Sequence, residues 1–544
     1  MKTMARSAHL DTFTRDHLPP PGHLPELIFE GAALQLPAQL NAVRALLDEP
    51  VAAGHGARPC LMGRHLGVDV RWSYAEVQAR ANRIANLLVQ ELGLVPGNRM
   101  LLRGANSPML ALCWLAVVKA GGVAVGTMPM LRARELKVII DKAQISHALC
   151  DARLAEELDI ARADGSTLAQ LLHFKADDEM SLEARAAAHS AAFEAVDTAA
   201  DDTCVIAFTS GTTGVPKGTM HFHRDLIAAC RCWPVYVLRA NRDDVFIGSP
   251  PLAFTFGLGG LLLFPLSVGA APALIKRATP DALLQAAAFW RASVLFTAPT
   301  SYRAMAPAVA AHDLSALRKC VSAGEALPGA TRLLWKQASG IELIDGIGST
   351  EMFHIFISAN EQDARPGATG VAVPGYRAAV LDEAGRELPP GTVGRLAVKG
   401  PTGCKYLADE RQQSYVQHGW NLTGDAYLVA SDGQFEYQAR TDDMIISGGY
   451  NIAGPEVESA LMEHPAVAEC GVVGSSDEAR GMIVKAVVVL RPGFTGDAMM
   501  VKNLHEHVKR SIAPYKYPRA IVFRDRLPRT ETGKLQRFKL REPS

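Results

Sequence analysis

The stretch FTSGTTGVPKG, residues 208–218, decides how the rest of the chain is interpreted. Glycine frees backbone N–H groups to point at an anion, the hydroxyl side chains add donors, and Lys217 adds positive charge. These features predict a loop that holds a polyphosphate. A P-loop of the form G-x-x-x-x-G-K-[ST] is excluded, because Pro216 and Gly218 stand where that pattern needs Gly and Ser or Thr.

Strand-like and helical patterns alternate on both sides of this loop. The strand CVIAFTS precedes it, and a helix is predicted to begin near His223. Similar units occur at RMLLRGANSPMLALCWLAVVKAGGVAVG, from Arg99, and at ASVLFTAPTSYRAMAPAVA, from Ala292. Strands that alternate with helices indicate parallel sheets covered by helices. The predicted class is therefore α/β.

The alternation of strand-like and helical patterns ends at about residue 360. Short strands separated by Gly and Pro turns, from Gly375 onward, predict a small β-rich section. The polar turn ARTDDMIISGGYNI, from Ala439, is the clearest boundary. We predict a large N-terminal domain over residues 1–441 and a small, mobile α+β domain over 442–544, an ordinary domain size.

Composition excludes several classes of protein. The 544 residues carry a formal net charge of zero and 48% hydrophobic residues, so neither nucleic acid nor another polyion is an expected partner. The nine cysteines show no disulfide or zinc spacing, which predicts a reducing, cytosolic setting. The N-terminus does not resemble a signal peptide. The apolar run 258–275 is broken by Pro265 and Pro272 and is interpreted as buried core rather than a membrane span.

Two further segments offer groups that suit a nucleotide. In GIGSTEMFHIF, residues 346–356, Thr350 and Glu351 could hold Mg²⁺ against phosphate oxygens, although such a pair is also a plain helix start. Asp425 follows a glycine and could accept both ribose hydroxyls, whereas Arg440 could neutralise a phosphate. Each would more often be an ordinary turn or surface residue when taken alone. A third segment, PRTETGKLQR, places Lys534 after a glycine near the end of the chain.

The order and spacing of these segments resemble the acyl-adenylate-forming superfamily, which includes acyl- and aryl-CoA ligases, luciferases and the adenylation domains of peptide synthetases. The resemblance rests on TSGTTGVPKG, GSTE, TGD, RTDD and PRTETGK and covers nearly the whole chain. It implies that the enzyme uses ATP with Mg²⁺ bound by Glu351. The positions that it implies for ATP binding are Thr209, Ser210, Gly211, Thr212, Thr213, Gly214, Lys217, Gly324, Glu325, Asp345, Gly346, Asp425 and Arg440.

The resemblance also implies a reaction in two halves. A carboxylate attacks the α-phosphorus of ATP and expels pyrophosphate, and two anions can approach only where positive charge and hydrogen-bond donors are aimed at the transition state. Lys534, Thr350 and Glu351 would supply this catalysis. The small domain then rotates about Asp442 so that CoA, as co-substrate, can attack the acyl-adenylate. Gly448, Gly449 and Tyr450 would face the thiol.

The acid pocket is expected to use two segments, PLAFTFGLGG and GIGSTEMFHIF. The predicted residues are Phe254, Thr255, Phe256, Ala323, Gly348, His354 and Ile355, which form an apolar slot with one polar edge and suit an aromatic ring. Thr255 stands where relatives that activate amino acids carry an aspartate, which argues against a free α-amino acid. Gly348 stands where acetate-specific relatives carry a bulky aromatic residue, which leaves room for a larger acid.

The motif context resembles benzoate–CoA ligases, and DTFTRDHLPPP near the N-terminus resembles the 2-aminobenzoate branch. His354 is the expected specificity residue, hydrogen-bonded to the carboxylate or an ortho substituent; a packed core histidine is the alternative. His221 and His223 are interpreted as helix-start histidines near the acid pocket rather than metal ligands. We expect an aryl–CoA ligase that is a monomer or homodimer with no membrane partner. A medium- or long-chain fatty acyl–CoA ligase and a stand-alone enzyme that loads a carrier protein stay open.

Overall fold

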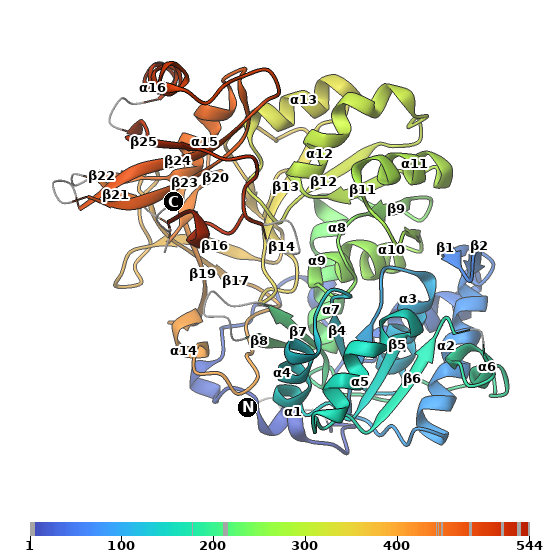
Figure 1. The fold of residues 1–544 in the computed structure, drawn as a ribbon. Helices are drawn as coiled ribbons and strands as arrows, with labels where there is room; N and C mark the ends of the chain where they lie inside the picture. The colour runs from blue at the N-terminus through green and yellow to red at the C-terminus, as the bar shows by residue number, and fades with distance from the viewer. Residues whose placement is uncertain are drawn as a thin grey trace.

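This computed structural model (Figure 1) describes residues 6–176, 178–209, 216–441, 443, 445–447, 450–477, 481–512, 516–529 and 535–541. A six-stranded sheet forms the first layer of the N-terminal region. Its strand order is β6-β5-β3-β4-β7-β8, and all neighbours are parallel except β7 and β8. The strands are β3 (Arg99–Arg103), β4 (Val123–Thr127), β5 (His147–Asp151), β6 (Gln170–Phe174), β7 (Thr203–Thr209) and β8 (Lys217–Phe222).

Helices cover both faces of this sheet, as the sequence predicts. Leu101 in β3 packs with one set of helices and its neighbours Met100 and Leu102 pack with another, because successive strand residues face opposite sides. The covering helices are α2 (Tyr74–Gln90), α3 (Pro108–Lys119), α4 (Ala133–Ala143), α5 (Ala155–Ala163) and α6 (Leu182–Ala187), with α1 (Phe13–Asp16) near the N-terminus. Helix α2 begins with a capping box formed by Ser73 and Glu76.

A nine-stranded sheet forms the second layer, in the order β15-β14-β13-β12-β11-β9-β10-β1-β2. Its strands are β1 (Pro59–His65), β2 (Val68–Ser73), β9 (Val245–Gly248), β10 (Ala271–Leu274), β11 (Val294–Thr297), β12 (Lys319–Ser322), β13 (Leu343–Gly348), β14 (Ile355–Ser358) and β15 (Val371–Ala372). Helices α11 (Pro280–Trp290), α12 (Pro299–Met305) and α13 (Gly329–Ser339) cover one face, while Val294 and Phe296 on the other face join the core shared with the first sheet.

Short helical segments line the shared core between the two sheets. They are α7 (His223–Arg231), α8 (Trp233–Tyr236), α9 (Thr255–Leu258), the π-helical turn η6 (Gly259–Leu263) and α10 (Phe264–Ser267). The apolar run 258–275 therefore lies in buried core, as predicted, with Leu262 and Phe264 fully buried. No helix in the described part of the chain is both long and apolar enough to span a membrane.

The β-rich section and the small domain follow in the predicted order. The section is a five-stranded sheet of β16 (Arg377–Leu381), β17 (Gly394–Lys399), β18 (Val416–Gln417), β19 (Trp420–Val429) and β20 (Phe435–Arg440), with α14 (Gln412–Tyr415) beside it. The small domain, orange to red in Figure 1, contains β21 (Ile445–Ser447), β22 (Tyr450–Ile452), α15 (Gly454–Met462), β23 (Val467–Asp477), β24 (Gly481–Leu490), α16 (Ala498–Ser511), β25 (Ala520–Phe523) and α17 (Phe538–Arg541). It has its own apolar core, which includes Val457, Val472 and Leu504.

The N-terminal segment, residues 7–28, links the first sheet to the β-rich section. The Ser7 hydroxyl and the Ala8 N–H donate to Asp202, just before β7. At its other end, the Ile28 N–H donates to the Gly400 carbonyl at 2.9 Å, and Glu26 pairs with Lys399 at 2.5 Å. The segment therefore depends on residues almost 400 positions later in the sequence.

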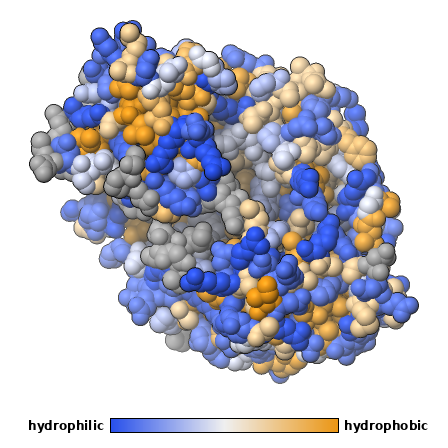
Figure 2. All heavy atoms as spheres, in the orientation of Figure 1, coloured by the Kyte–Doolittle hydropathy of each residue, from blue (hydrophilic) through white to orange (hydrophobic). Residues whose placement is uncertain are grey.

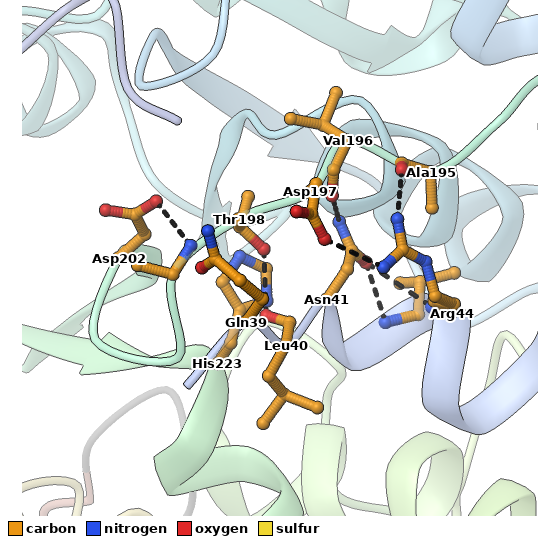
Figure 3. Close-up of polar contacts among 12 residues, drawn as sticks. Gln39, Leu40, Asn41, Arg44, Ala195, Val196, Asp197, Thr198, Asp202 and His223 are labelled. Carbon is orange, nitrogen blue, oxygen red and sulfur yellow. Dashed lines mark hydrogen bonds and ion pairs between the residues drawn. The ribbon is translucent and has the colours of Figure 1, made fainter. Parts of the chain in front are cut away.

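A second link joins residues 39–44 to residues 196–198, which precede β7 (Figure 3). The Thr198 hydroxyl donates to the Leu40 carbonyl at 2.8 Å, and Arg44 reaches Asp197 at 3.0 Å. The buried Asn41 amide donates to the Val196 carbonyl at 3.1 Å. These contacts fix residues 39–44 against the sheet that carries the phosphate loop.

Polar and apolar side chains are interspersed on the face drawn in Figure 2, in line with the balanced charge of the sequence. Large exposed apolar residues such as Leu10, Met180, Phe289 and Phe538 are scattered over different elements. Scattered apolar residues are normal for a folded protein.

Candidate active site

The predicted phosphate loop connects β7 and β8, an antiparallel pair in which Thr209 lies opposite Lys217. Residues 210–215, which include Ser210, Gly211, Thr212, Thr213 and Gly214, lie outside the described residues. Both ends of the loop are therefore held by one hairpin. Lys217, at its exit, is half-buried and points its ammonium group at Tyr406.

Tyr406 connects Lys217 to Glu351. The Tyr406 hydroxyl donates to Glu351 Oε1 at 2.5 Å, and the Lys217 Nζ donates to the same phenol oxygen at 3.2 Å. Glu351 is 9% exposed, so this carboxylate is held almost out of solvent. The neighbouring Ser349 hydroxyl lies 3.3 Å from the Tyr415 hydroxyl, whose ring packs edge-on against Tyr406. The structure thus brings the predicted phosphate lysine and the predicted metal carboxylate together.

A buried ion pair lies directly behind this group. Lys405 Nζ is 2.8 Å from Asp225 Oδ2, and both side chains are at most 2% exposed. His221 lies 3.9 Å from the same oxygen, and burial with the Lys405 charge lowers the pKa of His221 to about 4. His221 is therefore neutral at physiological pH and packs edge-on against Phe353.

The carboxyl ends of two parallel strands of the second sheet form another part of the site. Ser322 in β12 pairs with Asp345 in β13, so the residues that follow each strand meet at one edge. These residues are Ala323, Gly324 and Glu325 after β12, and Gly346 to Glu351 from the end of β13 onward. Clefts at such edges commonly hold ligands in α/β folds. Burial raises the pKa of Asp345 to about 7, against the opposing effect of Arg332.

The predicted ribose and phosphate residues lie opposite each other on β19 and β20. Asp425 and Arg440 are register partners, and their side chains pair at 3.1 Å. Gly424 adopts a left-handed φ of 76°, and a Cβ there would lie 2.6 Å from the Arg440 guanidinium. The backbone conformation thus favours glycine before Asp425, and a side chain there would also displace the end of Arg440.

The predicted acid pocket is built around an aromatic cluster. His354, 4% exposed, lies between Phe256, Phe264 and Trp233, with ring centroids 4.4–5.9 Å away. Burial lowers the pKa of His354 to about 3, so the ring is neutral. Its Nε2 donates to the Phe256 carbonyl at 3.3 Å, which leaves Nδ1 as an acceptor that is buried without a partner among the described residues.

The other predicted pocket residues lie at two neighbouring places. Phe254 and Phe256 are half-buried and flank Thr255, the first residue of α9. Gly348 pairs with Ile355, and a Cβ on Gly348 would lie 2.7 Å from the His354 backbone. Close approach of β13 and β14 is thus a second reason for glycine here, besides the room it was expected to leave.

The interpretation of the two histidines in MHFHRD needs one correction. His223 begins α7, as expected, but His221 lies on β8 because the antiparallel hairpin continues to Phe222. The His223 Nδ1 accepts the Ala42 N–H at 3.1 Å. No group of three or more potential metal-ligating His, Cys, Asp or Glu side chains occurs within the described ranges.

The predicted catalytic lysine and several CoA-site residues are not described by the structure. Lys534, Asp442, Gly448 and Gly449 lie outside the described residues, and Tyr450 is described only as part of β22. Flanking residues are informative. Arg529 forms an antiparallel β-bridge with Leu535. Its guanidinium Nη1 lies 3.7 Å from Glu325 Oε1 at the edge of the second sheet. The two ends of the segment that contains Lys534 are therefore close together, and one of them faces the predicted ATP site.

Sequence reasoning missed Tyr406, Lys405 and Asp225. Tyrosine and lysine in GCKYLADE carry no local signal, and Asp225 reads as part of a helix start. Only the register between the segment 403–407 and β8 brings them together.

Two family models match the sequence of this chain. The model described as AMP-binding enzyme matches residues 49–406, and the model described as AMP-binding enzyme C-terminal domain matches residues 456–534. The chain belongs to the AMP-binding enzyme family. It is an AMP-forming acyl- or aryl-CoA ligase, which uses ATP and CoA.

The relatives include both acyl- and aryl-CoA ligases. The chain is 36% identical over 517 residues to a benzoate–CoA ligase of Thauera aromatica, covering 94% of this chain and 97% of that protein. It is 30% identical over 523 residues to a 4-hydroxybenzoate–CoA/benzoate–CoA ligase of Rhodopseudomonas palustris, covering 92% and 94%. Among solved structures, the anthranilate CoA ligase AuaEII in complex with anthranoyl-AMP matches with a TM-score of 0.88 at 33% identity, covering 94% of this chain and 98% of that one.

Proposed function

We propose that this protein adenylates 2-aminobenzoate or benzoate with ATP and then transfers the aryl group to CoA. The observation that carries the proposal is the closed aromatic floor formed by Trp233, Phe256, Phe264 and His354. The similarity to benzoate– and anthranilate–CoA ligases supports the same substrate class.

The first half reaction uses the hairpin loop and its surroundings. The carboxylate oxygen of the acid attacks the α-phosphorus of ATP, the bond to the bridging oxygen breaks, and pyrophosphate leaves with the electron pair. Lys217, Lys534 and the loop N–H groups would supply positive charge and donors to this transition state. Asp425 would hold the ribose, with Arg440 beside the phosphate.

Magnesium fits the oxygen donors near Glu351. A buried carboxylate next to the Thr350 hydroxyl offers hard oxygen ligands, and Mg²⁺ is usually bound by one or two carboxylates together with substrate phosphates. Bound there, the ion would neutralise phosphate charge as pyrophosphate leaves. The carboxylate of Glu351 is already oriented by Tyr406.

The shape of the acid pocket favours a short, flat acid. Phe256 and His354 pack against Phe296 and Phe264, so the space beyond them is filled by rings. Behind Phe254 and Thr255 lies a cavity of ≈ 20 Å³, which is room for about one water molecule. The small cavity and the packed rings leave little room for a long acyl chain, whereas an aromatic ring would stack on the half-buried phenylalanines.

The neutral His354 favours an acid with a hydrogen-bond donor. Because Nε2 donates to the Phe256 carbonyl, Nδ1 can only accept. A carboxylate has no proton to give it, but an ortho amino group has. We therefore assign the expected hydrogen bond to the substituent rather than to the carboxylate, and we favour 2-aminobenzoate.

In the second half reaction the CoA thiol attacks the acyl carbon, and AMP leaves. Rotation of the small domain about Asp442 would withdraw Lys534 and bring Gly448, Gly449 and Tyr450 to the thiol. The cytoplasmic setting rests on nine cysteines that are all free and buried. The monomeric or homodimeric state stays a prediction.

The test is pyrophosphate release by the purified enzyme with a panel of acids, with and without CoA. The panel contains benzoate, 2-aminobenzoate, 2-methylbenzoate, hexanoate and palmitate. The methyl compound has nearly the shape of the amino compound but no donor. A site built to hydrogen-bond a substrate N–H rejects an analogue that lacks it by a large factor, because its own polar atom is left unpaired.

A preference for 2-aminobenzoate over 2-methylbenzoate, with turnover that needs CoA, would support both the aryl pocket and the His354 assignment. Equal rates for the two ortho compounds would contradict the proposed hydrogen bond to His354 but would not contradict the aryl pocket. A preference for palmitate would refute the closed floor. Full turnover only with an added carrier protein would favour the stand-alone adenylation enzyme.

A further inference from the structure

We infer that Tyr406 is a positioning residue of the ATP site: its hydroxyl stands between Lys217 and Glu351, orients both, and keeps them from pairing directly. The inference rests on the phosphate and magnesium roles proposed above for these two residues. It concerns the arrangement of the site before MgATP binds.

The hydrogen bonds run in one direction through the phenol. Lys217 Nζ donates to the Tyr406 oxygen at 3.2 Å, and the Tyr406 hydroxyl donates to Glu351 Oε1 at 2.5 Å. An ammonium can only donate and a carboxylate can only accept, so this is the one arrangement of protons that satisfies all three groups. No direct ion pair joins Lys217 to Glu351 in the part of the chain that the structure describes.

Main-chain contacts fix the phenol at this place. The Met220 N–H donates to the Lys405 carbonyl and the Leu407 N–H donates to the Gly218 carbonyl, each at 2.8 Å. The segment 403–407 therefore lies beside β8, and Tyr406 forms an isolated antiparallel β-bridge with Thr219. The Tyr406 N–H donates to Gln412 Oε1 at 2.9 Å. Tyr406 is therefore attached to the same strand that carries Lys217 away from the phosphate loop.

The buried ion pair behind the segment prevents it from sliding. Lys405 reaches into the core, where Asp225 holds its ammonium at 2.8 Å and the Gly403 carbonyl accepts a second bond at 2.9 Å. Side chains alternate along an extended segment, so a fixed Lys405 on one side fixes Tyr406 on the other. On its outer side, the Tyr406 ring also packs against Tyr415.

Separation of the two charges matters because each has its own task. A lysine and a glutamate that formed a direct, poorly solvated ion pair would have to break it before phosphate and metal could bind, and breaking such a pair is costly. With the phenol between them, both groups keep their charge and orientation and need little reorganisation. Tyr406 thus contributes to affinity for MgATP without touching the reacting atoms.

The experiment measures binding, without turnover, of a non-hydrolysable ATP analogue, α,β-methylene-ATP, by isothermal titration calorimetry with Mg²⁺ and with EDTA. Tyr406→Phe is expected to weaken Mg²⁺-dependent binding about tenfold to a hundredfold, the range for a hydrogen bond to a charged group. Binding in EDTA should change less, because the effect acts through the metal carboxylate. Tyr406→Phe combined with Glu351→Gln should lose no more than Glu351→Gln alone.

Tyr74→Phe is the matched control, since it also removes a buried phenol hydrogen bond, to the Ala270 carbonyl at 2.9 Å, on α2. Thermal unfolding of both variants separates positioning from stability. The inference is wrong if Tyr406→Phe binds the ATP analogue with Mg²⁺ as tightly as the parent does. It is also wrong if Tyr406→Phe weakens binding equally with Mg²⁺ and with EDTA while its Tm falls further than that of Tyr74→Phe. If Glu351→Gln and Lys217→Ala also bind normally, the proposed ATP site itself is wrong.

Discussion

Replacement of Gly259 by alanine is the sharpest available test of the acid pocket. Gly259 begins the π-helical turn η6, directly after Thr255–Leu258, and an added Cβ would lie 2.4 Å from His354 Cδ2 and 3.0 Å from its Nε2. Ordinary contact starts at about 3.4 Å, so the imidazole must move by about 1 Å. Ring packing on its other sides, by Trp233 and Phe264, leaves little room for that movement.

The expected effect is on the acid rather than on ATP. A misplacement of about 1 Å can cost about a hundredfold in rate, so Gly259→Ala should lower kcat/KM for 2-aminobenzoate by about tenfold to a hundredfold. Overpacking should cost about 1–3 kcal/mol of stability. The assay is steady-state pyrophosphate release with the acid varied at saturating ATP and CoA, followed by the same measurement with ATP varied.

Gly22→Ala is the control, since nothing lies within 4 Å of an added Cβ there. A Gly259→Ala enzyme that keeps its kcat/KM for the acid within about threefold, at an unchanged Tm, would mean that His354 does not border the acid pocket. A rise in KM for ATP alone would place the disturbed ring near the nucleotide instead.

Three further outcomes are expected. Lys405→Met should lower the free energy of unfolding in urea by about 3–5 kcal/mol, because it leaves the fully buried Asp225 unpaired, and the double variant Lys405→Met/Asp225→Asn should regain part of that loss. If Lys405→Met alone is as stable as the parent, the pair is solvated. Asp345→Asn should raise Tm more at pH 8 than at pH 5, because burial raises the pKa of Asp345 in the folded protein to about 7 from its ordinary 3.8. The folded protein therefore loses stability as pH rises from about 4 to 7 and this carboxyl ionises, whereas asparagine stays neutral; a gain in Tm that does not depend on pH would contradict this sign. Lys534→Ala should abolish adenylation yet largely spare thioester formation from supplied aryl-AMP, and equal loss of both half reactions would refute the division of roles.

Local patterns in the sequence predict most of the fold. The Ser73 cap, the strand before the phosphate loop and the helix that begins at His223 each follow from residues within one turn or strand. The family motifs predict that Glu351 and Lys217 lie at one site, and the structure connects them through a single side chain. In these cases local propensity and tertiary packing favour the same structure.

The parts that could not be predicted depend on register between distant segments. His221 was expected at a helix start, but antiparallel pairing with β7 extends β8 to Phe222. Tyr406 meets Glu351 only because the segment 403–407 runs beside β8. The chemistry of His354 likewise depends on the Phe256 carbonyl, almost a hundred residues away, which decides which ring nitrogen carries the proton.

The N-terminal segment has a consequence for the order of events during synthesis. Residues 7–28 are synthesised long before some of their partners, because Glu26 and Ile28 bind residues 399, 400 and 419. At about 5–20 residues per second, those partners emerge roughly 20–80 s later. Until then this end of the segment has nothing to dock on and stays open to proteases. Residues 26–28 thus reach their final positions only after about 370 further residues have been added to the chain.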